Sequence, residues 1–236
     1  KHDIRRYIPG DVFRDISVRH TLKEISRQKK NLSDIARRDF KVFMKQFRRL
    51  RSDIVICVDA SGSMGFRQKL IHARLVAAGL ARAALEIGDK VGIVAFDNFG
   101  RTIAPITDRK KDVFNYLVAI RAGGNTNIGD GIKCATELLF HEPGRNQKYI
   151  VLITDGEPSA LSRKAFDRLK PVKEKDLTEE SAFLEASRAS SRGVTTSVIH
   201  ITGGDEAAQE FVKKIAGIGR GSVQKISTLE DLRAIM

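Results

Sequence analysis

From residue 53 onward, short apolar runs alternate with longer segments whose apolar residues recur at helical spacing. Runs that are apolar on both faces are typical of strands in a parallel sheet covered by helices. We expect strands at 53–60, 90–97, 149–154, 194–201 and 222–226, with 101–105 pairing beside the second as a hairpin. We expect helices at 69–88, 109–121, 127–142, 178–192, 206–216 and 229–236. This alternation predicts an α/β fold: a doubly wound, mostly parallel central sheet with helices on both faces.

Residues 1–52 lack this alternation. Helical spacing is present at 15–28, and the apolar residues of 40–47 fit either a strand or a helix. We interpret 40–47 as an extended strand. The sequence therefore predicts an N-terminal segment at 1–52, followed by one domain at 53–236.

The N-terminal segment carries most of the positive charge. The whole chain has a formal net charge of +13; residues 1–52 hold 16 Lys or Arg against six Asp or Glu, a net +10, which leaves +3 for the domain. Such a segment is either a solvated face or a docking arm for an acidic surface or for phosphate. Charge alone does not decide between the two.

The overall composition narrows the class of protein. The chain is 42% hydrophobic and 30% charged, which is typical of a globular protein, and no apolar run approaches the roughly 18 residues of a membrane span. Cys57 and Cys134 lie far apart without metal-ligand spacing, so we expect free thiols and a cytoplasmic location. Because the chain begins at Lys1 rather than Met, we expect a piece of a longer protein.

Three loops that follow predicted strands or precede a predicted helix carry oxygen ligands. The loop DASGS contains Asp59, Ser61 and Ser63; GGNT contains Thr126; TDG contains Asp155. In α/β sheets, ligands bind at the carboxyl ends of the strands, and hydroxyl and carboxylate oxygens are suitable ligands for Mg²⁺. Any one loop could equally be a helix cap or a turn. Three together favour a metal site.

These residues resemble a known site. An Asp-x-Ser-x-Ser loop after an apolar strand, a Thr in a Gly-rich loop and a strand ending in Thr-Asp-Gly are similar to the metal-ion-dependent adhesion site (MIDAS) of von Willebrand factor type A (vWA) domains. The resemblance covers about 53–236 and implies a Rossmann-like fold. It also implies Mg²⁺, with Mn²⁺ or Ca²⁺ as alternatives. Direct ligands would be the hydroxyls of Ser61, Ser63 and Thr126, while Asp59 and Asp155 would act through water or hydroxyl contacts.

The same resemblance implies a protein partner. In this family, an Asp or Glu of the partner completes the coordination of the metal. The stretches RYIPGD at 6–11 and VRHTL at 18–22, with the basic run to residue 51, resemble the lead-in of prokaryotic vWA proteins. Those proteins are similar to the magnesium-chelatase D subunit and to proteins that act with MoxR-type AAA+ ATPases. We therefore expect an interaction module that works beside an AAA+ ATPase in assembly or metal insertion, without porphyrin chemistry of its own.

Motifs for catalysis are missing from the sequence. There is no Gly-x4-Gly-Lys-Ser/Thr phosphate loop, and the histidines form no His-x3-His pair. A haloacid dehalogenase would need a second Asp where Ser61 stands, and no nucleophile lies beside a base. His200, at the end of a strand, is interpreted as a packed or solvated histidine. We expect that the chain is not an enzyme.

Two alternatives remain open. The first is a nucleic-acid-associated protein that binds through 1–52, although the segment has little aromatic interleaving beyond Phe40, Phe43 and Phe47. The second concerns the charged connection at 157–177, which is either a surface insertion or an element that contacts a partner.

Overall fold

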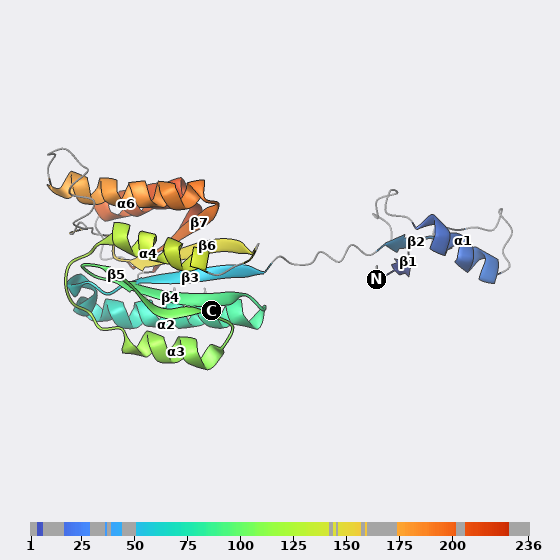
Figure 1. The fold of residues 1–236 in the computed structure, drawn as a ribbon, viewed down its shortest axis with the longest axis horizontal. Coiled ribbons are helices and arrows are strands. Elements are labelled where there is room, and N and C mark those ends of the chain that lie inside the picture. Colours follow the sequence, from blue (N-terminus) through green and yellow to red (C-terminus); the bar gives the residue numbers. More distant parts are fainter. Residues whose placement is uncertain are drawn as a thin grey trace. The chain divides into compact units, whose positions relative to one another are not determined.

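The computed structural model describes residues 4–6, 17–28, 36, 39–43, 51–141, 144, 146–156, 159, 174–201 and 206–226 (Figure 1). The chain divides into two compact units, Lys1–Arg49 and Leu50–Met236. This division lies close to the expected boundary at 52, and Ser52 is the first residue of a strand in the second unit.

The second unit is built around one six-stranded sheet with the strand order β5-β4-β3-β6-β7-β8. Every neighbouring pair is parallel except β4 and β5, which form the expected antiparallel hairpin. The strands are β3 (Ser52–Asp59), β4 (Lys90–Phe96), β5 (Gly100–Thr107), β6 (Gln147–Thr154), β7 (Val194–Ile201) and β8 (Arg220–Ile226). The predicted α/β fold with a mostly parallel sheet is confirmed.

Alternate residues of β3 supply two separate cores. Ile56 and Val58 pack with α2 (Lys69–Glu86) and α3 (Lys110–Ala119) on one face of the sheet. Val55 and Cys57 pack with residues of the helices on the other face. Those helices are α4 (Ile128–His141), α6 (Glu174–Ser191) and α7 (Glu206–Ile218). This burial on both faces explains the unbroken apolar run in the sequence, and Figure 1 shows the two helical layers.

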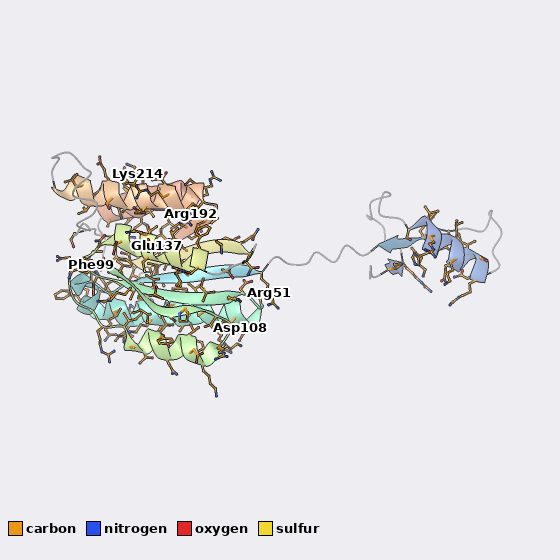
Figure 2. The ribbon with its side chains drawn as sticks, viewed as in Figure 1. Arg51, Phe99, Asp108, Glu137, Arg192 and Lys214 are labelled. Carbon is orange, nitrogen blue, oxygen red and sulfur yellow. The ribbon has the colours of Figure 1, made fainter. Side chains whose placement is uncertain are left out.

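The carboxyl ends of the parallel strands lie at one edge of the sheet. Figure 2 shows Phe99, in the β4–β5 turn, at this edge, and Arg51, just before β3, at the opposite one. No described helix is both long and apolar enough to cross a membrane.

The structure differs from the expectations in three places. The helix expected at 178–192 begins earlier, at Glu174. Its first turn was not predicted, because its residues are mostly charged and show no apolar periodicity. A 3-10 helix that was not expected, η4 (Gly62–Gln68), follows β3 and contains a kink. The strand β1 (Ile4–Arg6) was also missed, since it is only three residues long. The helix expected at 229–236 lies outside the described residues, as does most of the connection 157–177.

The first unit contains a small two-stranded sheet and one helix. β1 pairs antiparallel with β2 (Lys41–Phe43), so the interpretation of 40–47 as a strand is confirmed for its described part. The helix α1 (Val18–Arg27) is tied to β2 because the Lys41 amide donates to Thr21 Oγ1 over 2.9 Å.

Candidate metal centre

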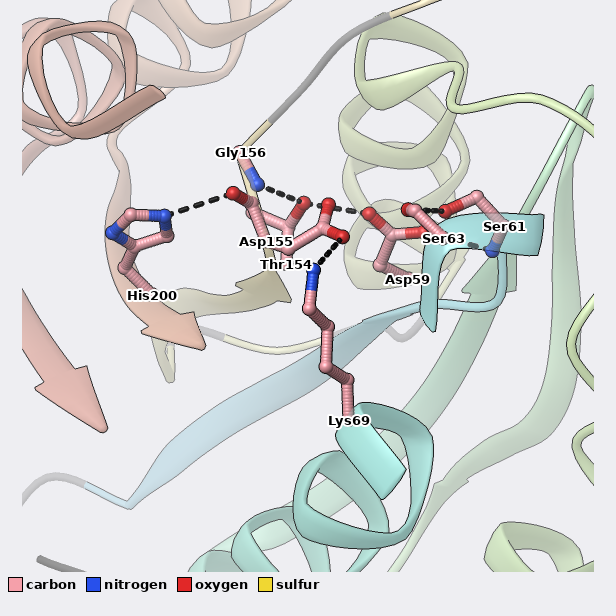
Figure 3. Close-up of polar contacts among 8 residues, drawn as sticks. All are labelled: Asp59, Ser61, Ser63, Lys69, Thr154, Asp155, Gly156 and His200. Atoms are coloured by element: carbon pink, nitrogen blue, oxygen red, sulfur yellow. Dashed lines mark hydrogen bonds and ion pairs between the residues drawn. The ribbon is translucent and has the colours of Figure 1, made fainter. Parts of the chain in front are cut away.

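Two aspartates lie at the ends of adjacent strands. Asp59 is the last residue of β3 and Asp155 directly follows β6. These strands are parallel neighbours with Val58 opposite Ile153, so the register brings the two carboxylates to the same edge of the sheet. Figure 3 shows both side chains there.

The Asp59 carboxylate is fully buried and held by two donors. The Ser61 amide donates to Oδ1 over 2.9 Å, and the Thr154 hydroxyl donates to Oδ2 over 2.6 Å. Burial raises the pKa of Asp59 to about 6; the hydrogen bond from Thr154 opposes this rise and the charge of Asp155 adds to it. A cation beside Asp59 would favour its charged form.

Thr154 connects the strand end to the turn that follows. Its hydroxyl donates to Asp59 and accepts from the Gly156 amide over 3.0 Å. Gly156 has φ +84, and a Cβ there would lie 3.1 Å from the Ala208 carbonyl oxygen. The turn therefore needs glycine for its backbone conformation and for its close approach to α7.

The serine and threonine loops are joined through their backbones. The Ser61 and Ser63 hydroxyls lie 3.1 Å apart. The Gly62 amide donates to the Gly124 carbonyl over 2.9 Å, and the Gly123 amide donates to the Ala60 carbonyl over 2.8 Å. These two bonds fix the loop that carries Thr126 against the loop that carries the serines.

Thr126 itself is buried and attached to a more distant residue, Ser159. The Thr126 amide donates to Ser159 Oγ over 2.9 Å, and the Ser159 amide donates to the Thr126 carbonyl over 3.0 Å. Of the five predicted ligands, Asp59, Ser61 and Ser63 are thus joined by hydrogen bonds, and Asp155 follows Thr154, the donor to Asp59. Thr126 is connected to them through loop backbone.

Asp155 has one paired and one unpaired oxygen. Its Oδ2 accepts from Lys69 Nζ over 2.9 Å, with the Asp155 side chain 2% and the Lys69 side chain 19% exposed. Its Oδ1 is buried and has no hydrogen-bond partner among the described residues. A buried carboxylate oxygen without a donor is costly, so this atom is a natural ligand for a cation or for its bound water.

His200 supports Asp155 from the other side. Its Nε2 lies 2.8 Å from the Asp155 carbonyl oxygen, which can only accept, so Nε2 carries the hydrogen. Burial lowers the pKa of His200, which favours the neutral ring. The buried Nδ1 has no partner in the described part of the chain. His200 is therefore a packed residue that holds the backbone of the third loop.

The donor set suits a hard divalent cation. It consists of two carboxylates and three hydroxyls, and oxygen ligands of this kind bind Mg²⁺ and Ca²⁺. Softer metals prefer thiolate and imidazole ligands, which are not among the five predicted ligands. The residues present therefore fit the metal that the resemblance implies.

Three contributors were not identified from the sequence. Thr154 precedes Asp155 in the TDG motif, and its place at the end of a buried strand could have identified it. Lys69 and Ser159 stand in no motif that would mark them as site residues. The kinked backbone of η4 brings Lys69 to the site, and a hydrogen bond with Thr126 brings Ser159 there.

The sequence of the second unit is similar to sequences of known proteins. A family model described as the von Willebrand factor type A domain matches residues 54–157. Inter-alpha-trypsin inhibitor heavy chain H4 of Sus scrofa is 29% identical over 118 residues, 45% of this chain and 12% of that protein. An uncharacterized protein of Mycobacterium tuberculosis is 28% identical over 117 residues, 45% of this chain and 18% of that protein. The chain spans less than a fifth of either curated relative.

Solved structures share the fold. BatB, a conserved hypothetical protein of Bacteroides thetaiotaomicron, has a TM-score of 0.60 at 21% identity over 78% of this chain and 95% of its own. A von Willebrand factor type A protein of Catenulispora acidiphila has a TM-score of 0.59 at 20% identity, over 78% of this chain and 41% of its own. The vWF domain of the type V pili tip protein Mfa5 from Porphyromonas gingivalis has a TM-score of 0.63 at 16% identity, over 79% of this chain and 94% of its own. The second unit is therefore similar in sequence to the von Willebrand factor type A domain over residues 54–157, and it shares its fold with these solved structures.

Proposed function

We propose that the second unit is a divalent-metal-dependent protein-interaction module. The observation that carries the proposal is the convergence of two buried carboxylates and two serine hydroxyls at one sheet edge, with Asp155 Oδ1 left without a partner. Mg²⁺ is the proposed metal, with Mn²⁺ or Ca²⁺ as alternatives. Its ligands are Asp59, Ser61, Ser63, Thr126 and Asp155.

The chemistry of this donor set favours an acidic partner. Three of the five ligands are neutral hydroxyls, so the site supplies less negative charge than a site made only of carboxylates. A metal held in this way retains positive potential and attracts an Asp or Glu from another protein. An interaction role for this chain would be consistent with its fold, which it shares with the vWF domain of the type V pili tip protein Mfa5.

The partner class follows from the lead-in sequence. The stretches at 6–11 and 18–22 resemble proteins that act with MoxR-type AAA+ ATPases. We propose such an ATPase as the partner and assign no catalysis to this chain. The net charge of +13 would speed the approach of an acidic protein surface.

A metal titration with a matched pair of variants tests the proposal. Asp59→Asn removes a proposed ligand while keeping the shape of the side chain. Asp53→Asn alters a second buried carboxylate on β3, at the opposite end of the strand, where it pairs with Asn146 and Lys148. Calorimetry with Mn²⁺ should show binding for the wild type and for Asp53→Asn, and none for Asp59→Asn. Unchanged binding by Asp59→Asn would exclude the site.

A second candidate function concerns the first unit. Arg19, Lys23 and Arg27 are exposed on α1 at intervals of four residues, so they lie along one helical stripe. Such a stripe can contact nucleic-acid phosphates. Binding to duplex DNA that falls steeply with salt, and that is lost when the three are changed to Ala, would support this alternative.

A further inference from the structure

The ion pair between Lys69 and Asp155 places a cation of the chain itself inside the candidate metal centre. We propose that Lys69 neutralises Asp155 while no metal is bound, and that an arriving divalent cation displaces its ammonium group. Lys69 would thereby set the affinity of the site for metal. This inference rests on the proposed function, because it assigns a regulating residue to the same site.

The backbone before Lys69 is shaped to deliver this side chain. Lys69 is the first residue of α2, and the two residues before it, Arg67 and Gln68, have φ of 49° and 59°. Residues other than glycine rarely adopt this left-handed conformation, and pairs of them persist only where surrounding structure holds them. The kink turns the chain from η4 into α2, and Figure 3 shows Lys69 reaching from α2 to Asp155.

The charges of the site favour displacement by a divalent ion. Asp59 and Asp155 place two carboxylates at adjacent strand ends, whereas Lys69 brings one positive charge, which is paired with Asp155 Oδ2. A divalent cation can balance both carboxylates and also use the unpaired Asp155 Oδ1. The ammonium and the metal repel each other at such short range.

The Lys69 side chain can leave without disturbing the fold. Its side chain is 19% exposed, so part of it already borders solvent, whereas the Asp155 side chain is 2% exposed. A lysine has a flexible stem and its ammonium is strongly hydrated, so movement into water costs little. The Asp155 backbone stays in place, because His200 holds its carbonyl oxygen.

A second buried lysine pair provides a matched control. Lys148 Nζ lies 3.4 Å from Asp53 Oδ2, with side chains 10% and 2% exposed. Asp53 lies near the start of β3, whereas the metal centre lies at its end. Removing Lys148 therefore takes the ion-pair partner from a similar buried aspartate, which keeps its hydrogen bond from Asn146 and lies at the opposite end of β3 from the metal centre.

The test compares the wild-type chain with Lys69→Met and Lys148→Met. Mn²⁺ affinity is measured by calorimetry. The melting temperature is measured twice, once in EDTA and once in saturating Mn²⁺. Lys69→Met should bind Mn²⁺ about tenfold more tightly, a change of about 1.4 kcal/mol. Its melting temperature should be lower than that of the wild type in EDTA and equal to it, or higher, in Mn²⁺. Lys148→Met should melt lower in both conditions with unchanged Mn²⁺ affinity.

The outcomes separate this inference from the proposed function. If the wild type binds Mn²⁺ and Lys69→Met binds it equally or more weakly, displacement is wrong while the metal site stands. If neither protein binds Mn²⁺, both the metal site and the displacement are wrong. Lys69→Arg retains the positive charge and serves where Lys69→Met does not fold; displacement predicts wild-type affinity for it, and a tenfold gain would contradict the inference.

Discussion

The hydroxyl of Thr154 should contribute more to stability than any other threonine hydroxyl of the sheet that the structure describes. Thr154→Val keeps the shape of the side chain but removes the donor to Asp59 Oδ2 and the acceptor for the Gly156 amide. A hydrogen bond to a charged group contributes about 1.5–3 kcal/mol, and a buried amide left unpaired costs about 1–3 kcal/mol. We expect Thr154→Val to lower the free energy of unfolding by about 3 kcal/mol in EDTA, since the two effects overlap.

Thr196 gives the matched comparison. It is also fully buried on a strand, β7, but its hydroxyl has no hydrogen-bond partner among the described residues. Thr196→Val therefore removes a buried polar group that gains nothing from burial, and should stabilise the protein by about 1 kcal/mol. Urea unfolding of the two variants and the wild type, in EDTA, measures both changes. Equal effects of the two substitutions would refute the reasoning, because the only intended difference is the pairing of the hydroxyl.

Three further predictions follow from the site and the core. A pull-down from native lysate should recover an acidic partner in Mg²⁺, and much less of it in EDTA or with Thr126→Ala; equal recovery in all three would move recognition away from the metal. The purified chain should hydrolyse neither ATP nor a general phosphatase substrate, and turnover that is lost with Asp59→Asn would contradict this. Gly131→Ala should lower the free energy of unfolding by about 2 kcal/mol, because its Cβ would lie 2.7 Å from the Phe96 ring, whereas Gly217→Ala, also in a helix, meets nothing within 4 Å and should stabilise by up to about 1 kcal/mol in chemical denaturation.

The strands and the two aspartates could be predicted because each signal is local. An apolar run followed by a polar turn marks both the strand and the carboxylate at its end, as for Asp59 and Asp155. Parallel pairing then brings the ends together without further information from the sequence. The two predicted serine ligands, Ser61 and Ser63, stand in the loop that Asp59 begins, so they lie at the same strand end.

Lys69 and Ser159 could not be predicted, because their positions depend on contacts that are not local in sequence. Lys69 reaches the site through a kink at Arg67 and Gln68, and neither residue type favours the left-handed conformation they adopt. Ser159 contacts Thr126 across 33 residues of sequence. Such contacts depend on the tertiary arrangement of loops, which periodicity does not report.

β3 lies in the middle of the sheet, so the parts of the candidate site should differ in how easily their backbone hydrogen bonds open. β3 is hydrogen-bonded to β4 on one side and to β6 on the other, so the full set of its amides is released only when both ladders separate. Hydrogen exchange at 54–58 should therefore require global unfolding, whereas the amides of 123–126, in a loop, should exchange through local opening. Asp59 therefore ends a strand that opens only with the whole domain, whereas the hydrogen bonds of the loop carrying Thr126 can break locally without loosening either core.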